Sequence, residues 1–245
     1  MADAGTVRFT RQGGIWTATL DHPESGNAIT REMLEQLADG LSEAARTPDC
    51  AVLVLQGAGD QFSVGRMRGA AHERLTPVGI RGELEVITRA NALLVEAPCV
   101  TIAAVHGQAL GAACGLVARC DLAIAAANAR FGFPEIKAGI PPTIVMSYVA
   151  KAFPTKAAFE LIITGRELSA VEAQALGFVN RVVPAEQVLS EAIVLAQEIA
   201  AGDPLVVRTC KQFFREAQEI SYAAAARYGV NLLATIQADQ QARRG

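Results

Sequence analysis

The fold of this chain is indicated most clearly by the stretch Val105-His106-Gly107-Gln108-Ala109-Leu110-Gly111-Ala112-Ala113-Cys114. An apolar run ends there in a turn of small residues, and a helical pattern over residues 111–119 follows directly. Glycine lets a backbone bend tightly and approach a ligand closely. The N–H groups at a helix N-terminus lack partners within the helix and form the positive end of its dipole. The stretch therefore predicts a strand–turn–helix unit whose turn faces a cleft.

Two further segments supply the other parts of a reactive site. Phe62-Ser63-Val64-Gly65-Arg66 contains a second tight glycine turn, and Phe131-Gly132-Phe133-Pro134-Glu135 places one carboxylate among apolar residues. The backbone amides of Arg66 and Ala112, if they converge, can bind a carbonyl oxygen that gains negative charge. Burial of the Glu135 carboxyl would raise its pKa toward the range useful for proton transfer.

Each of these features also has a simpler structural interpretation. Either glycine turn alone is explained by close packing of a strand against a helix. A buried carboxylate is costly unless it is paired or used, and Glu135 has Arg130 and Lys137 nearby in sequence as ion-pair partners. The combination of two turns with one acid favours the functional interpretation.

The arrangement of apolar runs predicts an α/β fold. A continuous apolar run at 51–55 and two further predicted strands at 99–105 and 121–125 alternate with helical patterns, including one at 79–96. Runs of this kind are typical of parallel strands that are covered on both faces by helices.

The remaining segments have their own local signals. The alternation from Val7 to Leu20 predicts a hairpin, and Thr30 is a plausible cap for the helix that follows. From Pro142 onward the pattern is mainly helical, with a capping box at Ser169–Glu172. One more short strand is predicted at 178–183, and a last helix from 221 to about 240.

Composition excludes several classes of function. The 245 residues are 51% hydrophobic and carry a formal net charge of −3, which indicates one globular domain, with or without a helical appendix, and no nucleic-acid-binding surface. There is no apolar run of the length that spans a bilayer and no signal-peptide pattern, so a cytoplasmic location is predicted. Five cysteines without a CxxC pair and three widely separated histidines predict buried thiols and no metal site.

Six motifs together carry a resemblance to a known family. In chain order they identify the sequence as similar to the crotonase, or enoyl-CoA hydratase/isomerase, family along nearly its whole length. They are Phe62-Ser63-Val64-Gly65, Val105-His106-Gly107-Gln108-Ala109-Leu110-Gly111, Cys120-Asp121-Leu122-Ala123-Ile124-Ala125, Phe131-Gly132-Phe133-Pro134-Glu135, Leu161-Ile162-Ile163-Thr164-Gly165-Arg166 and Ala173-Gln174-Ala175-Leu176-Gly177-Phe178-Val179.

The resemblance implies an α/β, crotonase-like (ClpP/crotonase) fold, with a core of stacked ββα turns over residues 1–183. Residues 184–245 would form a C-terminal helical region that assembles homotrimers, often paired into hexamers. The implied substrate is an acyl-CoA thioester, and coenzyme A is then part of the substrate. No metal or redox cofactor is implied.

The resemblance also assigns roles to individual residues. The oxyanion amides fall on Arg66 and Ala112, and Glu135 falls on the second of the two glutamates of a hydratase. Residues 68–90 are expected to form the wall of the acyl pocket. Substrate contacts fall on Glu24, Ser25, Gly26, Val64, Gly65, Met67, Arg68, Gln108, Gly111, Pro134 and Gly139.

The departures from the family pattern are informative. Gly115 stands where a two-glutamate hydratase has its first glutamate, and 140–145 replaces a glycine-rich turn. One carboxylate suffices to move a proton between carbons, which favours double-bond isomerisation, although some relatives described as hydratases also have glycine there. After Gly65 the family commonly has a small residue and then an acid, whereas this chain has Arg66-Met67-Arg68. The two arginine side chains could meet a CoA phosphate or an acyl carboxylate, or lie solvated on the surface. The chain also lacks the phenylalanine-containing basic tail that often closes a neighbour's site.

Three functional hypotheses follow. The first is isomerisation or hydration of an enoyl-CoA, with isomerisation favoured on the carboxylate count. The second is decarboxylation or other enolate chemistry on a carboxyacyl-CoA, in which Arg66 or Arg68 would steer the extra carboxylate. The third is a non-catalytic paralogue that binds acyl-CoA, against which the acid beside two turns argues.

Overall fold

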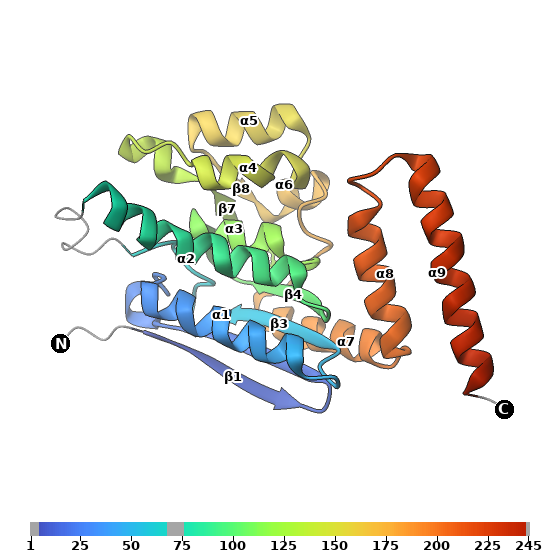
Figure 1. Cartoon of the computed structure of the whole chain (residues 1–245). Coiled ribbons are helices and arrows are strands. Elements are labelled where there is room, and N and C mark those ends of the chain that lie inside the picture. Colours follow the sequence, from blue (N-terminus) through green and yellow to red (C-terminus); the bar gives the residue numbers. More distant parts are fainter. Residues whose placement is uncertain (1–4, 68–75, 244–245) are drawn as a thin grey trace.

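The computed structural model describes residues 5–67 and 76–243, which form two β-sheets surrounded by helices (Figure 1). The larger sheet has six strands in the order β1-β2-β3-β4-β6-β9. These strands are β1 (Thr6–Gln12), β2 (Ile15–Asp21), β3 (Val52–Gly57), β4 (Val100–Val105), β6 (Leu122–Ala126) and β9 (Arg181–Val183).

The N-terminal hairpin and the helix after it follow directly from their sequence. β1 and β2 pair antiparallel from Thr6 opposite Asp21 to Gln12 opposite Ile15, which confirms the predicted hairpin. Helix α1 (Arg31–Arg46) begins after Thr30, whose side chain accepts a hydrogen bond from the Met33 amide at 3.2 Å. The predicted cap is therefore confirmed.

The central strands are parallel, as their continuous apolar runs predict. β2, β3, β4, β6 and β9 pair in parallel in that order. Helix α2 (Pro77–Glu96) lies between β3 and β4 in the chain and packs beside α1. Helix α3 (Ala112–Arg119) lies between β4 and β6 in the chain. This arrangement brings the ends of β3 and β4, and the turns that follow them, to one edge of the sheet.

The last strand is shorter than predicted. Pairing of β9 starts at Arg181 rather than at Phe178. The preceding residue, Asn180, already binds β6 through both its backbone amide and its side-chain oxygen, each 2.8 Å from a backbone atom of Ala123. The ring of Phe178 packs instead against Phe131 and Phe153.

A second, three-stranded sheet was not predicted from the sequence. It consists of β5 (Gln108–Leu110), β7 (Arg130–Gly132) and β8 (Glu167–Ser169). Each strand has only three residues, which is too short for alternation to be recognised. This sheet places the turn after β5 beside the segment after β7, where Glu135 lies.

Helices form most of the chain after residue 142. They are α4 (Thr143–Ala152), α5 (Thr155–Thr164), α6 (Ala170–Ala175), α7 (Val188–Ala200), α8 (Pro204–Glu216) and α9 (Tyr222–Ala242), with a 3-10 turn, η4 (Ala185–Gln187). The 3-10 turns η1 (Pro23–Ser25) and η3 (Pro134–Ala138) lie earlier in the chain. The predicted capping box of α6 is present in full. Helix α7 packs on β2, β3, β4 and β6, whereas α8 and α9 stand side by side at one end of the molecule (Figure 1). In the described part of the chain, no helix is both long and apolar enough to cross a membrane.

A buried ion cluster attaches α8 to the sheet. Asp121, at the start of β6, accepts hydrogen bonds from Lys211 at 2.8 Å and from Arg215 at 2.7 Å. The Lys211 side chain is only 7% exposed, and its ammonium also donates to the Cys99 carbonyl at 2.7 Å. Oδ2 of Asp121, the oxygen that pairs with Lys211, also accepts hydrogen bonds from the backbone amide and hydroxyl of Thr101, whereas Arg215 binds Oδ1. Asp121 therefore has a structural role.

We expect Asp121→Asn to lower the free energy of unfolding by about 3–5 kcal/mol, because it leaves the buried Lys211 ammonium without its anion. The quantity to measure is the urea midpoint at one fixed protein concentration. The matched control is Asp39→Asn, which breaks an exposed pair with Arg89 that is worth about 1 kcal/mol or less. Equal losses in the two variants would contradict this role.

Candidate active site

The two glycine turns lie against each other. The Ser63 amide donates to the Gln108 carbonyl at 2.8 Å, and the Leu110 amide donates to the Ser63 carbonyl at 3.1 Å. Gly65 has a φ of +101°, and a Cβ added there would lie 2.7 Å from the Leu110 carbonyl oxygen. Only glycine fits this position without strain, because both the backbone angle and the space exclude a side chain. The turns after β3 and after β5 are thus held together.

The hydrogen bonds around Arg66 fix the direction of its backbone. Ile29 donates to the Gly65 carbonyl at 2.8 Å and accepts from the Met67 amide at 2.9 Å, which is a parallel bridge centred on Arg66. In such a bridge the N–H of the central residue points away from the bridging strand. The Arg66 amide therefore points away from Ile29, and Arg66 lines the cavity described below.

The turn at Gly111 presents the N-terminus of α3. Gly111 has a φ of +54° and donates its own amide to the Gly132 carbonyl at 2.8 Å. Ala112 is the first residue of α3, so its N–H is among those that have no acceptor within the helix. The positive end of the short helix dipole adds to the field at this point.

Glu135 stands directly beside this turn. It is the second residue of the 3-10 turn η3 and is half-buried. A Cβ added to Gly111 would lie only 2.7 Å from Oε1 of Glu135. The carboxylate thus packs on the backbone of Gly111, next to Ala112, as the sequence predicted for a neighbouring acid.

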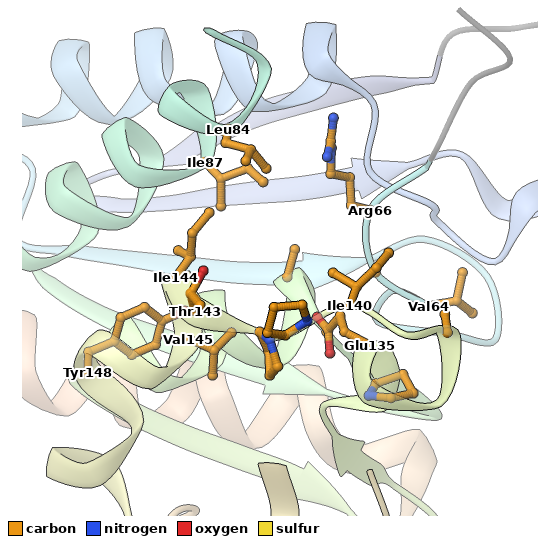
Figure 2. Close-up of a pocket in the computed structure, with 17 residues that line it drawn as sticks. Val64, Arg66, Leu84, Ile87, Glu135, Ile140, Thr143, Ile144, Val145 and Tyr148 are labelled. Carbon is orange, nitrogen blue, oxygen red and sulfur yellow. The ribbon is translucent and has the colours of Figure 1, made fainter. Parts of the chain in front are cut away.

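The turns and the carboxylate share one cavity of about 430 Å³ (Figure 2). Val64, Gly65, Arg66, Gly111, Ala112, Pro134 and Glu135 line it, all of them predicted site residues. The volume lies within the range of small-molecule sites, which are typically apolar with a few placed polar groups.

The apolar side of the cavity comes from two helices. Leu84 and Ile87 of α2 fall within the predicted wall at 68–90, of which residues 68–75 lie outside the described residues. Ile144, Val145 and Tyr148 of α4 were not identified from the sequence, although the departure at 140–145 pointed to this region. The remaining lining residues are Ala138, Ile140, Pro141, Pro142 and Thr143.

The Arg66 side chain is not a solvated surface group, so that alternative is wrong. It is 16% exposed and lies 3.5 Å from the Glu83 carboxylate, which also pairs with Arg31 at 2.7 Å. The Arg31 guanidinium, more than that of Arg66, lowers the pKa of Glu83. Figure 2 shows the Arg66 guanidinium pointing away from Glu135. Its charge is thus balanced outside the part of the cavity where Glu135 lies.

The other predicted contact residues lie outside the cavity lining. Gly26 packs on Val64 and accepts its amide at 3.0 Å, while the Ser25 hydroxyl donates to the His22 carbonyl at 2.9 Å. Glu24 is exposed on η1. Their role as a wall for the CoA moiety stays a prediction.

Three more of the predicted contact residues also lie outside the cavity lining, and a fourth lies outside the described residues. Met67 is 38% exposed, and Gly139 ends η3 with a φ of +71°. The Gln108 amide binds the Gln61 side chain at 2.6 Å. Arg68 lies outside the described residues. Their contact with substrate therefore also stays a prediction.

We expect Gly111→Ala to lower activity by about 10²-fold or more. The added methyl group would push the Glu135 carboxylate away and strain the turn that carries the Ala112 amide, so both groups expected to act on the substrate would move. Steady-state kinetics on an enoyl-CoA measures the loss. Gly13→Ala is the matched control, because it also has a positive φ, of +57°, but has no atom within 4 Å of the added carbon. Full activity of Gly111→Ala would show that the carboxylate position is unimportant.

Comparison with known proteins identifies the class to which this chain belongs. The model of the enoyl-CoA hydratase/isomerase family matches residues 10–245. A crystal structure of an enoyl-CoA hydratase from Mycobacterium smegmatis superimposes with a TM-score of 0.88 at 29% identity, over 94% of this chain and 90% of that one. The chain belongs to the enoyl-CoA hydratase/isomerase, or crotonase, family, and the predicted crotonase-like α/β fold is confirmed.

Relatives in sequence are named mostly for hydration. A putative enoyl-CoA hydratase from Thermus thermophilus is 35% identical over 82% of this chain and 80% of its own length. The 2,3-dehydroadipyl-CoA hydratase of Escherichia coli is 33% identical over 88% of this chain and 84% of its own length. An enzyme of this family acting on an acyl-CoA is therefore indicated.

Proposed function

We propose that this enzyme moves the double bond of an enoyl-CoA, using Glu135 as its acid and base. The observation that carries the proposal is the position of Glu135, which packs on Gly111 in the same cavity as Arg66 and Ala112. The thioester carbonyl would accept hydrogen bonds from the amides of Arg66 and Ala112. These donors stabilise the negative charge that this oxygen gains when an enolate forms.

In the proposed reaction, one carboxyl group, that of Glu135, both removes a proton from the substrate and returns it. Glu135 removes a proton from the α carbon of a 3-enoyl-CoA, and the electron pair moves onto the thioester oxygen as an enolate. The protonated carboxyl then returns the proton to the γ carbon, and the electron pair re-forms the carbonyl with the double bond at the α and β carbons. No water and no second acid are consumed, so one general acid–base group is sufficient.

The lining of the cavity supports isomerisation over hydration. Among the described residues that line it, Glu135 is the only carboxylate. Gly115 has no side chain, and a Cβ added there would overlap with the hydroxyl of Tyr148. A hydratase route that holds its water between two carboxylates would therefore lack one of them.

Hydration of a 2-enoyl-CoA is the second candidate, because relatives such as those from Thermus thermophilus and Escherichia coli are named hydratases. Decarboxylation of a carboxyacyl-CoA has less support, since the Arg66 guanidinium pairs with Glu83 and points away from Glu135. Assembly as a homotrimer or hexamer stays a prediction.

A direct test follows both reactions with the same enzyme. Purified protein is given 3-enoyl-CoA and, separately, 2-enoyl-CoA of several chain lengths, and the products are separated by chromatography. We expect a higher kcat/KM for conversion of 3-enoyl-CoA to 2-enoyl-CoA than for formation of 3-hydroxyacyl-CoA. Faster hydration at every chain length would assign the second candidate, and binding without turnover would indicate a non-catalytic paralogue.

A further inference from the structure

The hydroxyl of Tyr148 lies next to Gly115, where any other residue would place a Cβ. Gly115 lies in the second turn of α3, buried next to Cys114. A Cβ added at Gly115 would overlap with Tyr148 Oη, whereas the ring carbon that bears this hydroxyl would be 3.6 Å away, an ordinary contact. The hydroxyl therefore occupies the position from which a side chain at residue 115 would start.

Tyr148 reaches this position from another element and also forms part of the cavity. It lies on α4, and together with Ile144 and Val145 it lines the apolar side opposite Leu84 and Ile87 (Figure 2). The Arg119 guanidinium lies over its ring, 5.0 Å from the ring centre. Tyr148 thus contacts Arg119 through its ring and lines the same cavity as Glu135.

The surroundings keep the phenol neutral. Burial raises the pKa of Tyr148 above its ordinary value, and the nearby Asn91 side chain only partly opposes this shift. Asn91 itself is 5% exposed, and its Oδ1 has no hydrogen-bond partner among residues 5–67 and 76–243. A neutral phenol cannot take a proton from water at ordinary pH, so it cannot replace a carboxylate as a base.

We propose that Tyr148 determines reaction specificity, by filling with a neutral side chain the volume in which a second carboxylate or an attacking water would sit. This inference rests on the proposed isomerase function and extends it. Water addition needs a water molecule held near the β carbon and deprotonated there, which requires polar partners and room. Proton transfer between two carbons needs no bound water and no room for one, and exclusion of water prevents the competing hydration.

The closing experiment measures the ratio of hydration to isomerisation, each as kcat/KM on one chain length. Tyr148→Ala opens the cavity, and the double variant Gly115→Glu/Tyr148→Ala also adds a carboxylate in the vacated space. We expect the ratio to rise about 10-fold in the single variant and about 10²-fold in the double one, because a positioned acid–base group contributes about 10²–10⁴-fold. Met146→Ala is the control, since Met146 is 46% exposed on the same helix and is not part of the cavity lining.

The outcomes separate this inference from the proposed function. An active wild type whose ratio stays within about 3-fold in both variants overturns the role of Tyr148 and leaves the isomerase proposal standing, since a positioned acid–base group contributes about 10²–10⁴-fold. A wild type that isomerises no 3-enoyl-CoA overturns the proposed function, and this inference with it.

A stability measurement tests the steric premise without relying on activity. Gly115→Ala is expected to lower Tm by about 2–4 °C or more, because the added methyl group overpacks against the Tyr148 hydroxyl. In a Tyr148→Phe background, in which that hydroxyl is absent, the same substitution is expected to change Tm by less than half as much. Equal losses in both backgrounds would show that the two side chains do not compete for the space, and would overturn the inference.

Discussion

Glu135→Gln is expected to lower kcat for enoyl-CoA isomerisation by about 10²–10⁴-fold, the typical contribution of a general acid–base group. Glutamine keeps the size of the side chain and its packing on Gly111, but its amide cannot accept and return a proton. The loss should therefore fall on kcat, whereas KM changes little, because the thioester would still meet the Arg66 and Ala112 amides. Steady-state kinetics with a 3-enoyl-CoA measures both constants.

The control for this variant is Glu186→Gln, which removes an exposed carboxylate on η4, remote in sequence from the cavity lining. Its kcat should equal that of the wild type. Circular dichroism and the urea midpoint establish that Glu135→Gln is folded. If Glu135→Gln retains kcat within about 3-fold of the wild type, Glu135 is not the proton carrier, since that change lies well below the expected contribution.

Ala112→Pro is expected to lower kcat by about 10²–10³-fold, the usual effect of removing one oxyanion donor. The substitution removes the amide hydrogen that we propose binds the thioester oxygen. Ala112 is the first residue of α3, where proline is well tolerated because the missing N–H has no helical acceptor. This chain already carries proline at the corresponding position of α2 and α8.

The matched control is Ala112→Gly, which changes the side chain at the same position but keeps the amide N–H. It should retain kcat within about 10-fold, since a glycine at a helix start costs only local backbone entropy. A proline variant as active as the wild type would remove the Ala112 amide from the mechanism. Equal losses in both variants would attribute the effect to the side chain instead.

The parts of the fold that could be predicted from sequence were those with long or chemically distinct signals. The parallel strands β3, β4 and β6 have continuous apolar runs, and α1 and α6 begin at side chains that cap them. The small sheet of β5, β7 and β8 has no such signal. Its three-residue strands are defined by pairing between segments far apart in the chain, which no local pattern records.

The candidate site shows the same division. Gly65, Gly111 and Glu135 were identifiable because two glycine turns and a carboxylate among apolar residues occur together in the sequence. Tyr148 was not, because an aromatic residue on an amphipathic helix is ordinary. Its importance comes from contact with Gly115, a residue 33 positions earlier whose only feature is the absence of a side chain. The fold alone brings these two residues together, so no local sequence pattern shows their contact.

The fit between Tyr148 and Gly115 also constrains how this enzyme can change over generations. A carboxylate cannot enter position 115 while the phenol remains, so position 148 must first become small. That first step opens the cavity without supplying a new group, and selection for the present reaction would act against it. The two substitutions that would add a second carboxylate are therefore separated by an intermediate that gains no new group, so the contact between Tyr148 and Gly115 couples the two positions.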